Sequence, residues 1–83
     1  MSRDLIGITL VTSAGVLFQG KVHSAILPGQ QGVFEALPHH KSLLTLLIPG
    51  DIILDERVIP IQRGIVKVLS DNTVHAIVEI NSK

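Results

Sequence analysis

The chain has 83 residues, and its seven basic and seven acidic residues give a formal net charge of zero. This length fits one domain, which we take to span residues 1–83, and a hydrophobic content of 46% is enough for one core. A nucleic-acid-binding protein usually carries a basic patch, and single-strand binders add stacking aromatic residues. The neutral charge, with two Phe and no Trp or Tyr, argues against a nucleic-acid partner.

The sequence has neither cysteine nor a long apolar segment. The lack of cysteine excludes disulfide bonds and thiolate chemistry. No apolar run approaches the roughly 20 residues that a membrane-spanning helix needs. The N-terminal residues also lack the pattern of a signal peptide. We therefore expect no direct membrane insertion, so any membrane association would come through a partner.

Short β-branched stretches separated by turn residues predict many short strands. In the first of them, Ile6, Ile8 and Leu10 alternate with smaller residues at a period of two. A leucine-rich run at residues 42–48 fits a helix or a buried strand by pattern, but its short length between two prolines favours a strand. The strands expected from these patterns are residues 4–11, 16–19, 22–27, 33–37, 42–48, 51–54, 57–61, 65–69 and 74–80.

Turn signals separate these strands. Pro28-Gly29 fits the central positions of a type II turn, where proline fixes φ and glycine accepts a positive φ. Pro49-Gly50 is a second such turn, Asp55-Glu56 is expected to close a tight hairpin, and Ser-Asp-Asn at residues 70–72 is a further turn cluster. We predict an all-β chain of about eight to ten short strands, folded as an antiparallel β-sandwich or flattened barrel.

Two adjacent histidines, His39 and His40, are the residues that most suggest chemistry. Neighbouring residues of an extended chain point to opposite faces, so this pair is poorly placed to share a metal ion. Zinc sites need three or four converging ligands, and the sequence has no H-x-H, H-E-x-x-H or cysteine pair. Glu35 alternates with Phe34 and Ala36, so we expect its side chain on the outer face of its strand.

Nucleophilic and phosphate-binding motifs are also missing. No serine lies in a G-x-S-x-G setting, and the sequence GQQG at residues 29–32 lacks the lysine of a phosphate-binding loop. We therefore expect no catalytic, metal-binding or cofactor-binding residues. The sequence predicts a binding module rather than an enzyme.

Three stretches of the chain form an ordered series: LFQGKV at residues 17–22, LPGQQGVFEALPHHKSLLTLLIPGDI at 27–52, and IPIQRGIVKVLSDNTVHAIVE at 59–79. This series resembles the N-terminal β-sandwich domain of the epsilon subunit of F-type ATP synthases. Members of that family share an F-x-G-x-V stretch, a turn glycine pair and a proline-bounded loop with a histidine, followed by a P-G turn and a final alternating strand. No single motif is specific, but the ordered series is.

The resemblance implies a β-sandwich in the rotor of the complex, peripheral to the cytoplasmic face of the cell membrane as part of the F1 sector. In the family this domain has no active site. It packs against the gamma subunit and rests on the polar loops of the membrane rotor ring (c-ring), and so couples ion transport to ATP synthesis. When the family's contact positions are carried over to this sequence, the resemblance implies contacts to the ring from Gln30, Gln31, Val33, His39 and His40. It implies contacts to gamma from Thr12 and Thr45.

The chain departs from the family pattern at several positions. Many members have an acidic residue where this chain has Val33, and a proline where it has Ser42. His40 matches the family's histidine, whereas His39 stands where another residue, such as glycine, is usual. The usual member continues into a regulatory helical hairpin. Because this chain stops at Lys83, we expect a short form, natural or truncated, without that hairpin.

Two alternative functions stay open at the level of sequence. One is a free-standing β-sandwich adaptor of another protein complex. The other is a small metal-dependent enzyme that uses His39, His40 and Glu35, and it predicts stoichiometric metal in the purified protein.

Overall fold

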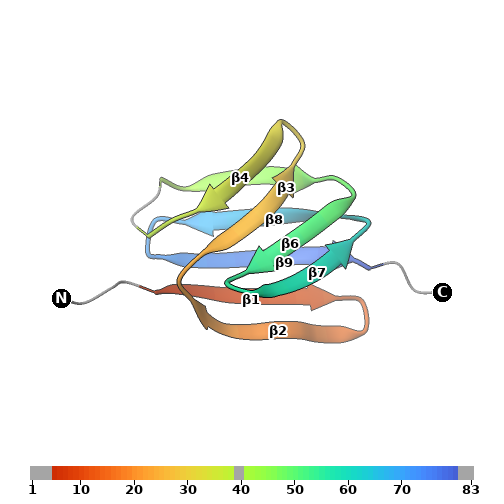
Figure 1. The fold of residues 1–83 in the computed structure, drawn as a ribbon, viewed down its shortest axis with the longest axis horizontal. Coiled ribbons are helices and arrows are strands. Elements are labelled where there is room, and N and C mark those ends of the chain that lie inside the picture. The colour runs from red at the N-terminus through yellow and green to blue at the C-terminus, as the bar shows by residue number, and fades with distance from the viewer. Residues whose placement is uncertain (1–4, 39–40, 81–83) are drawn as a thin grey trace.

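The computed structural model describes residues 5–38 and 41–80, and this part of the chain forms nine strands (Figure 1). Their hydrogen-bonded order is β2-β1-β9-β8-β5-β3-β6-β7, and β4 also pairs with β3. β1 and β9 run parallel, and the other pairs are antiparallel. The strands are β1 (Ile6–Thr12), β2 (Gly15–Val22), β3 (Ala25–Gly29), β4 (Gly32–Ala36), β5 (Leu43–Leu47), β6 (Gly50–Leu54), β7 (Arg57–Ile61), β8 (Arg63–Leu69) and β9 (Thr73–Glu79).

The sheet curls over on itself into two layers (Figure 1). We call β2, β1, β9, β8 and β5 the back layer, and β4, β3, β6 and β7, which cross in front of it, the front layer. The predicted all-β sandwich is therefore confirmed, with one parallel strand pair in it.

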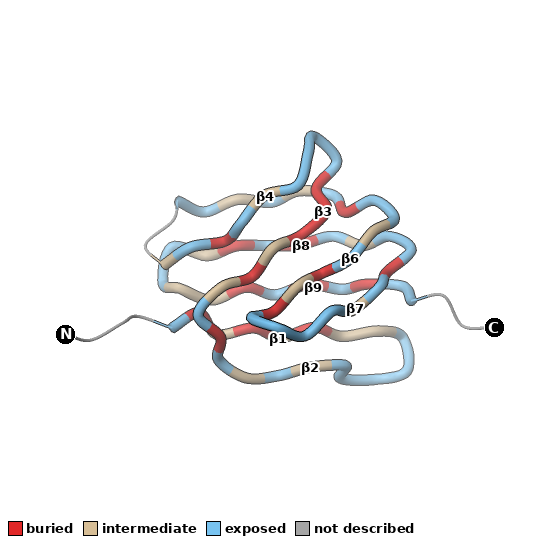
Figure 2. The backbone as a smooth tube through the Cα atoms, in the orientation of Figure 1, coloured by how far each residue is buried: buried red, intermediate tan, exposed pale blue. Residues whose placement is uncertain are grey.

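The core lies between the two layers. Because successive side chains of a strand point to opposite faces, each strand contributes alternate residues to it. Figure 2 shows buried segments on strands of both layers. Among the described residues every buried side chain of the core is hydrophobic: Ile6, Ile8, Leu10, Val22, Ala25, Leu27, Ala36, Leu47, Ile52, Leu54, Ile61, Val66, Val68, Val74, Ala76 and Val78.

β3 connects the two layers because one part of this strand pairs with the front layer and another part pairs with the back layer. Ala25 and Ile26 pair with β6 in the front layer, whereas Gly29 pairs with Leu47 of β5 in the back layer. The chain passes from β5 to β6 at this point, and the amide of Ile48 donates to the carbonyl of Pro28 at 2.9 Å. The predicted turn at Pro49-Gly50 is therefore a corner at which the chain changes layers, and Gly50 already belongs to β6.

The predicted turn at Pro28-Gly29 is wrong. Both residues lie in β3, where Pro28 pairs with Val33 and Gly29 with Gly32, and the turn itself is made by Gln30 and Gln31. Gly32, whose φ is +132°, supplies the positive φ that the sequence led us to assign to Gly29.

The prediction of a single strand at residues 22–27 is also wrong, because the end of one strand and the beginning of the next lie in this range. β2 runs through Gly20 to Val22, and β3 begins at Ala25. The break has a physical cause: one carboxylate oxygen of Asp55, Oδ1, accepts hydrogen bonds from the amides of His23 and Ser24, both at 3.0 Å. These amides are thereby bonded to a side chain. The expected turns at residues 55–56 and 70–72 are confirmed.

Side chains at the two ends of the sheet hold the curled structure closed. Asp55, in the β6–β7 hairpin, bonds the link between β2 and β3 as described above. Next to it, the guanidinium of Arg57 on β7 lies 5.4 Å from the ring centroid of Phe18 on β2. β2 and β7 are the two terminal strands of the sheet order, so these contacts join its ends.

The Asp55 contact gives a first prediction. Asp55 has a φ of 54°, which glycine accepts readily, so Asp55→Gly removes the acceptor without straining the backbone. Losing hydrogen bonds to a carboxylate should lower the free energy of unfolding by about 1–3 kcal/mol. Asp55→Asn keeps an acceptor oxygen and should cost clearly less. Urea denaturation of the two variants measures the difference, and equal losses would contradict the role of the acceptor.

Gly64 on β8 gives a second prediction. A Cβ at this position would lie 2.6 Å from the carbonyl oxygen of Ile77, so Gly64→Ala must push β8 and β9 apart. Overpacking of this kind typically costs about 1–3 kcal/mol. Gly7→Ala on β1 is the matched control, because its Cβ would make an ordinary contact of 3.5 Å with Thr73. Urea midpoints should separate the two variants, and equal midpoints would refute the close approach at Gly64.

Candidate interaction surface

The described part of the chain holds no candidate metal-binding cluster. Residues 5–38 and 41–80 contain no group of three His, Cys, Asp or Glu side chains that could hold a metal ion. His39 and His40 lie outside the described residues. Glu35 is exposed on the outer face of β4, as predicted, and accepts a hydrogen bond from the Ser24 hydroxyl at 2.6 Å. That bond ties β4 to the β2–β3 link.

The most distinctive surface is an apolar row on the outside of the back layer. Strand register places Val16, Val11, Ile77, Ile65 and Leu46 opposite one another, one from each of β2, β1, β9, β8 and β5. Four of the five are exposed, Ile77 to 61%. An outward face of an antiparallel sheet normally carries polar residues. We call these five residues the back row.

A register shift brings β2 into the back row. Leu10 pairs with Phe18, but the next residue, Val11, pairs with Val16. Leu17 is the extra residue of this β-bulge. Without the shift, Val11 would stand opposite Leu17, and Val16 would point with Phe18 toward the other face.

Polar groups border the back row on both sides. On one side, register aligns Gln19, Thr9, His75 and Lys67, and Leu44 ends that line. On the other side, Arg63 and Glu79 form an ion pair with an Nε–Oε1 distance of 3.1 Å. A shallow hollow of about 370 Å³ lies over β1, β9, β8 and β5 between the row and the first polar line. An apolar centre with a polar rim is the usual anatomy of a protein–protein interface.

The sequence contains a signal for the back row that pattern reading missed. A half-buried strand alternates apolar and polar residues, but four strands of the back layer contain two apolar residues in succession. In each pair one residue is in the core and its neighbour is in the back row. The pairs are Leu10-Val11, Leu46-Leu47, Ile65-Val66 and Ile77-Val78.

The expected ring-contact residues that the structure describes lie elsewhere. Gln30 and Gln31 form the exposed turn between β3 and β4, which projects at the top of Figure 1. Val33 follows on β4 and is 74% exposed. Leu37 and Pro38 come after the other end of β4, roughly 15 Å away for a five-residue strand.

The two expected gamma contacts are not brought together. Thr12 lies where β1 turns into β2, and its hydroxyl oxygen accepts a hydrogen bond from the amide of Ala14 at 3.0 Å. Thr45 is on β5, which is separated from β1 by β9 and β8. Alternation also sends Thr45 to the opposite face from Leu46, so it is not part of the back row.

Thr45 instead shares a small hollow with two expected ring contacts. Gln31 and Val33 line this hollow of about 240 Å³ together with Thr45, Gly29 and Phe34, among others. The structure thus places one predicted gamma contact beside two predicted ring contacts. Which partner each of them meets stays a prediction.

No helix in residues 5–38 or 41–80 is long and apolar enough to cross a membrane.

Comparison with known proteins gives a family match over nearly the whole chain. Residues 6–80 match the model of the ATP synthase delta/epsilon chain, β-sandwich domain. The ATP synthase epsilon chain of a Nitratiruptor species is 42% identical over 81 residues, which cover 92% of this chain and 62% of the relative. That of a Sulfurovum species is 36% identical over 75 residues, which cover 84% of this chain and 59% of the relative. The chain thus spans about three-fifths of the length of these relatives.

Solved structures agree on the fold. The chain superposes on a chain of the OSCP/F1/c-ring assembly of the Euglena gracilis mitochondrial ATP synthase with a TM-score of 0.81 and 18% identity. The match covers 94% of this chain and 53% of that one. A chain from the Tetrahymena thermophila mitochondrial ATP synthase central stalk/c-ring gives a TM-score of 0.74 and 16% identity, covering 95% and 66%. The family match, the two bacterial relatives and the shared fold lead to one conclusion: this chain belongs to the ATP synthase delta/epsilon family and forms the β-sandwich domain of that family.

Proposed function

We propose that the chain is a non-catalytic subunit of the central stalk of an F-type ATP synthase. It binds the gamma subunit and the c-ring, and so couples ion flow to ATP synthesis at the cytoplasmic face of the membrane. The observation that carries this proposal is the family match over residues 6–80. The relatives named ATP synthase epsilon chain support it, and so do the stalk and ring assemblies in which the fold occurs.

The back row is the surface best suited to a permanent protein partner, and we assign it to gamma. Full burial of one apolar side chain is worth about 1.5–3 kcal/mol, so an exposed row of aliphatic residues gains much from being covered. The row crosses five strands and so gives a partner a long contact edge. Thr12 and Thr45 stay predicted gamma contacts, and the back row is a further surface that we propose for gamma.

The β3–β4 hairpin is better suited to the c-ring. Its tip presents the two uncharged amides of Gln30 and Gln31, which can donate and accept hydrogen bonds. In the epsilon-subunit family this domain rests on polar loops of the ring. Side-chain amides can form hydrogen bonds with such loops without burying a charge. The hairpin projects beyond both layers, so it can reach a partner that the back row does not touch (Figure 1).

The gamma assignment is tested by a charge placed in the back row. Ile77→Asp should weaken binding to purified gamma at least tenfold, because the new carboxylate would be buried in the interface without a partner. A loss of about 1.4 kcal/mol in binding free energy already lowers the affinity tenfold. Val58→Asp on β7 is the matched control. Val58 is 55% exposed but belongs to the front layer, so this variant should bind gamma as the unchanged chain does.

Gel filtration of each variant mixed with gamma provides the measurement, and urea denaturation checks that both variants fold. Undiminished binding by a folded Ile77→Asp variant would contradict the assignment of the back row. If the unchanged chain failed to elute with gamma at all, the proposed function itself would be overturned.

The ring contact is tested by cross-linking, which the lack of cysteine in the chain makes specific. We expect Val33→Cys to form a disulfide with a cysteine placed in the polar loop of the c-ring in the assembled enzyme. A disulfide requires Cα atoms within about 7 Å, so its formation reports direct contact. Leu17→Cys on β2 is the control and should not cross-link. The reverse outcome, with Leu17→Cys linked and Val33→Cys free, would show that another edge faces the ring.

A further inference from the structure

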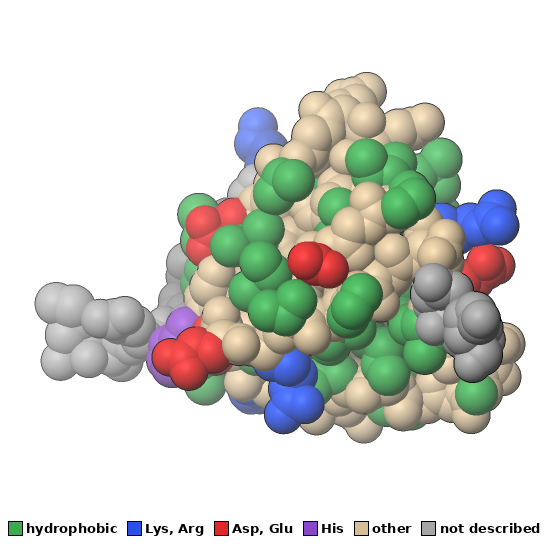
Figure 3. Space-filling model, turned by 45° about the vertical axis from the view of Figure 1, so that its right-hand side comes forward, with side chains coloured by type: hydrophobic (Ala, Val, Ile, Leu, Met, Phe, Trp, Pro, Cys, Tyr) green, Lys and Arg blue, Asp and Glu red, His purple; other side chains and the backbone are tan. Residues whose placement is uncertain are grey.

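The outside of the front layer carries an apolar row of its own. Register aligns Ile26 on β3 with Ile53 on β6, and Ile53 with Val58 on β7. Their neighbours along the strands, such as Leu27, Ile52 and Leu54, are buried, so alternation turns this row outward. Figure 3 shows hydrophobic side chains gathered on this side of the molecule, with acidic side chains among them. We call Ile26, Ile53 and Val58 the front row.

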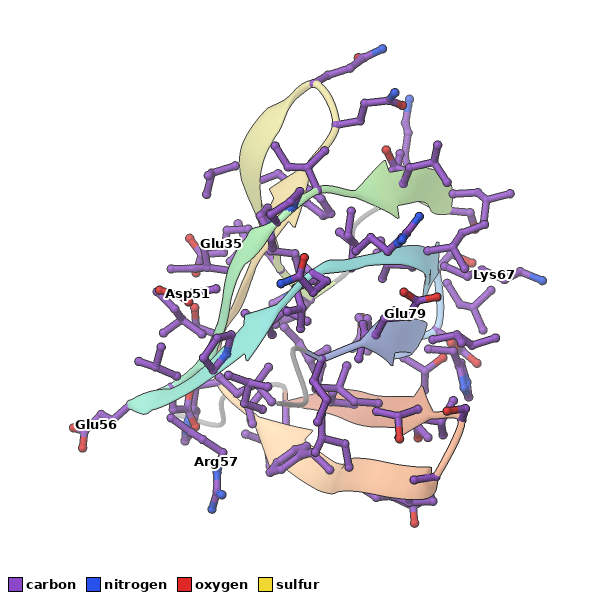
Figure 4. The ribbon with its side chains drawn as sticks, turned by 90° about the vertical axis from the view of Figure 1, so that its right-hand side faces the viewer. Glu35, Asp51, Glu56, Arg57, Lys67 and Glu79 are labelled. Carbon is purple, nitrogen blue, oxygen red and sulfur yellow. The ribbon has the colours of Figure 1, made fainter. Side chains whose placement is uncertain are left out.

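Carboxylates surround the front row. Glu35 on β4 stands directly opposite Ile26, and Asp51 lies two residues before Ile53 on the same face of β6. Glu56 follows at the tip of the β6–β7 hairpin. In Figure 4, Glu35, Asp51 and Glu56 lie on one side of the molecule, and Lys67 of the back layer lies on the other.

The net charge of zero therefore conceals a separation between the two layers. Residues 25–36 and 50–61, which make up the front layer and its hairpins, contain four carboxylates and a single cation, Arg57. Arg57 does not offset them on the outer face, because its guanidinium lies over Phe18 at the closure of the sheet. The strands of the back layer contain Lys21, Arg63 and Lys67 against Glu79.

Two of the front carboxylates have no partner in the part of the molecule that the structure describes. Glu35 accepts the Ser24 hydroxyl, and Asp55 accepts two backbone amides. The side chains of Asp51 and Glu56, by contrast, make no hydrogen bond or ion pair with any residue in 5–38 or 41–80. Their acceptor oxygens are available to a binding partner.

We propose that the outer face of the front layer is a second docking surface, and that it binds a basic protein surface in which Lys or Arg side chains surround an apolar centre. The apolar centre would cover Ile53 and Val58, and the cations would pair with Asp51 and Glu56 at the rim. Charge complementarity of this kind steers association and fixes the register of the two surfaces. The surface lies on the opposite side of the sandwich from the back row, so both can be occupied at once.

A second copy of the chain is a less suitable occupant. A contact between the acidic front face of one copy and the more basic back face of another would be heterologous, so it would continue from copy to copy instead of closing. It would also compete for the back row, which we assign to gamma. A separate basic partner satisfies the front face without that conflict.

Thiol accessibility in the native assembly tests the proposal, which does not depend on the gamma contact. Val58→Cys gives the chain a single thiol, because the chain has no cysteine of its own. In extracts of the source cells, a maleimide reagent should label this thiol at least tenfold more slowly than in the purified chain. Pro60→Cys, on the same face of β7, serves as a second variant, and Ser13→Cys in the exposed β1–β2 turn is the accessible control.

The contribution of the front carboxylates is tested by labelling the same thiol. Adding Asp51→Asn and Glu56→Gln, or raising the salt to about 0.5 M, where the Debye length falls to roughly 4 Å, should restore fast labelling. A benzophenone attached to the thiol of the Val58→Cys variant should then cross-link to a segment of another protein that carries a net positive charge. Rapid labelling of the assembled chain at both front positions would overturn the proposal, and so would a cross-link to an acidic segment or to a second copy.

Labelling of an Ile77→Cys variant in the same extracts distinguishes a failure of the second docking surface from a failure of the gamma assignment. Protection at position 77 with free labelling at 58 and 60 would refute the second docking surface alone. Protection at 58 and 60 with free labelling at 77 would refute the gamma assignment and leave the second surface standing.

Discussion

The divided pairing of β3 is the constraint on which the rest of the molecule depends. Its first residues pair with β6 and its last with β5, so one continuous sheet turns back over itself at this strand. Two layers follow, and the hydrophobic residues of both meet between them. Gly50 fits at the corner because a Cβ there would lie 2.9 Å from the Pro28 side chain. The contacts of Asp55 and Arg57 then hold the free ends of the sheet together.

The same register that fills the core also builds the outer surfaces. Side chains alternate along a strand, so residues that pair across strands share a face. In the back layer this aligns one aliphatic residue from each strand, with the bulge at Leu10/Val11 bringing in β2. In the front layer it aligns Ile26, Ile53 and Val58 beside carboxylates. The small sandwich thus presents two different outer faces, one with a long apolar row and one with a short apolar row among carboxylates.

The sequence was sufficient for the fold class, most strands and the Asp55-Glu56 hairpin, because these follow from local alternation and turn chemistry. It misplaced the turn at Pro28-Gly29, since proline and glycine fit a strand end as well as a turn when β5 and Phe34 pack against them. It also joined β2 to β3, because the Asp55 side chain that separates them is distant in sequence. The back row was missed for a related reason: only pairing reveals that outward apolar residues of five strands form one line.

We propose as the central claim that gamma covers the back row; membership of the ATP synthase delta/epsilon family and the geometry of the row support it. Methyl NMR of the isotopically labelled chain tests the claim most directly, because Ile, Leu and Val methyl groups report on both faces at once. On addition of unlabelled gamma, we expect shifts at Val11, Leu46, Ile65 and Ile77, with Ile53 and Val58 unchanged. Shifts confined to the front layer, with Ile65 and Ile77 unaffected, would contradict it.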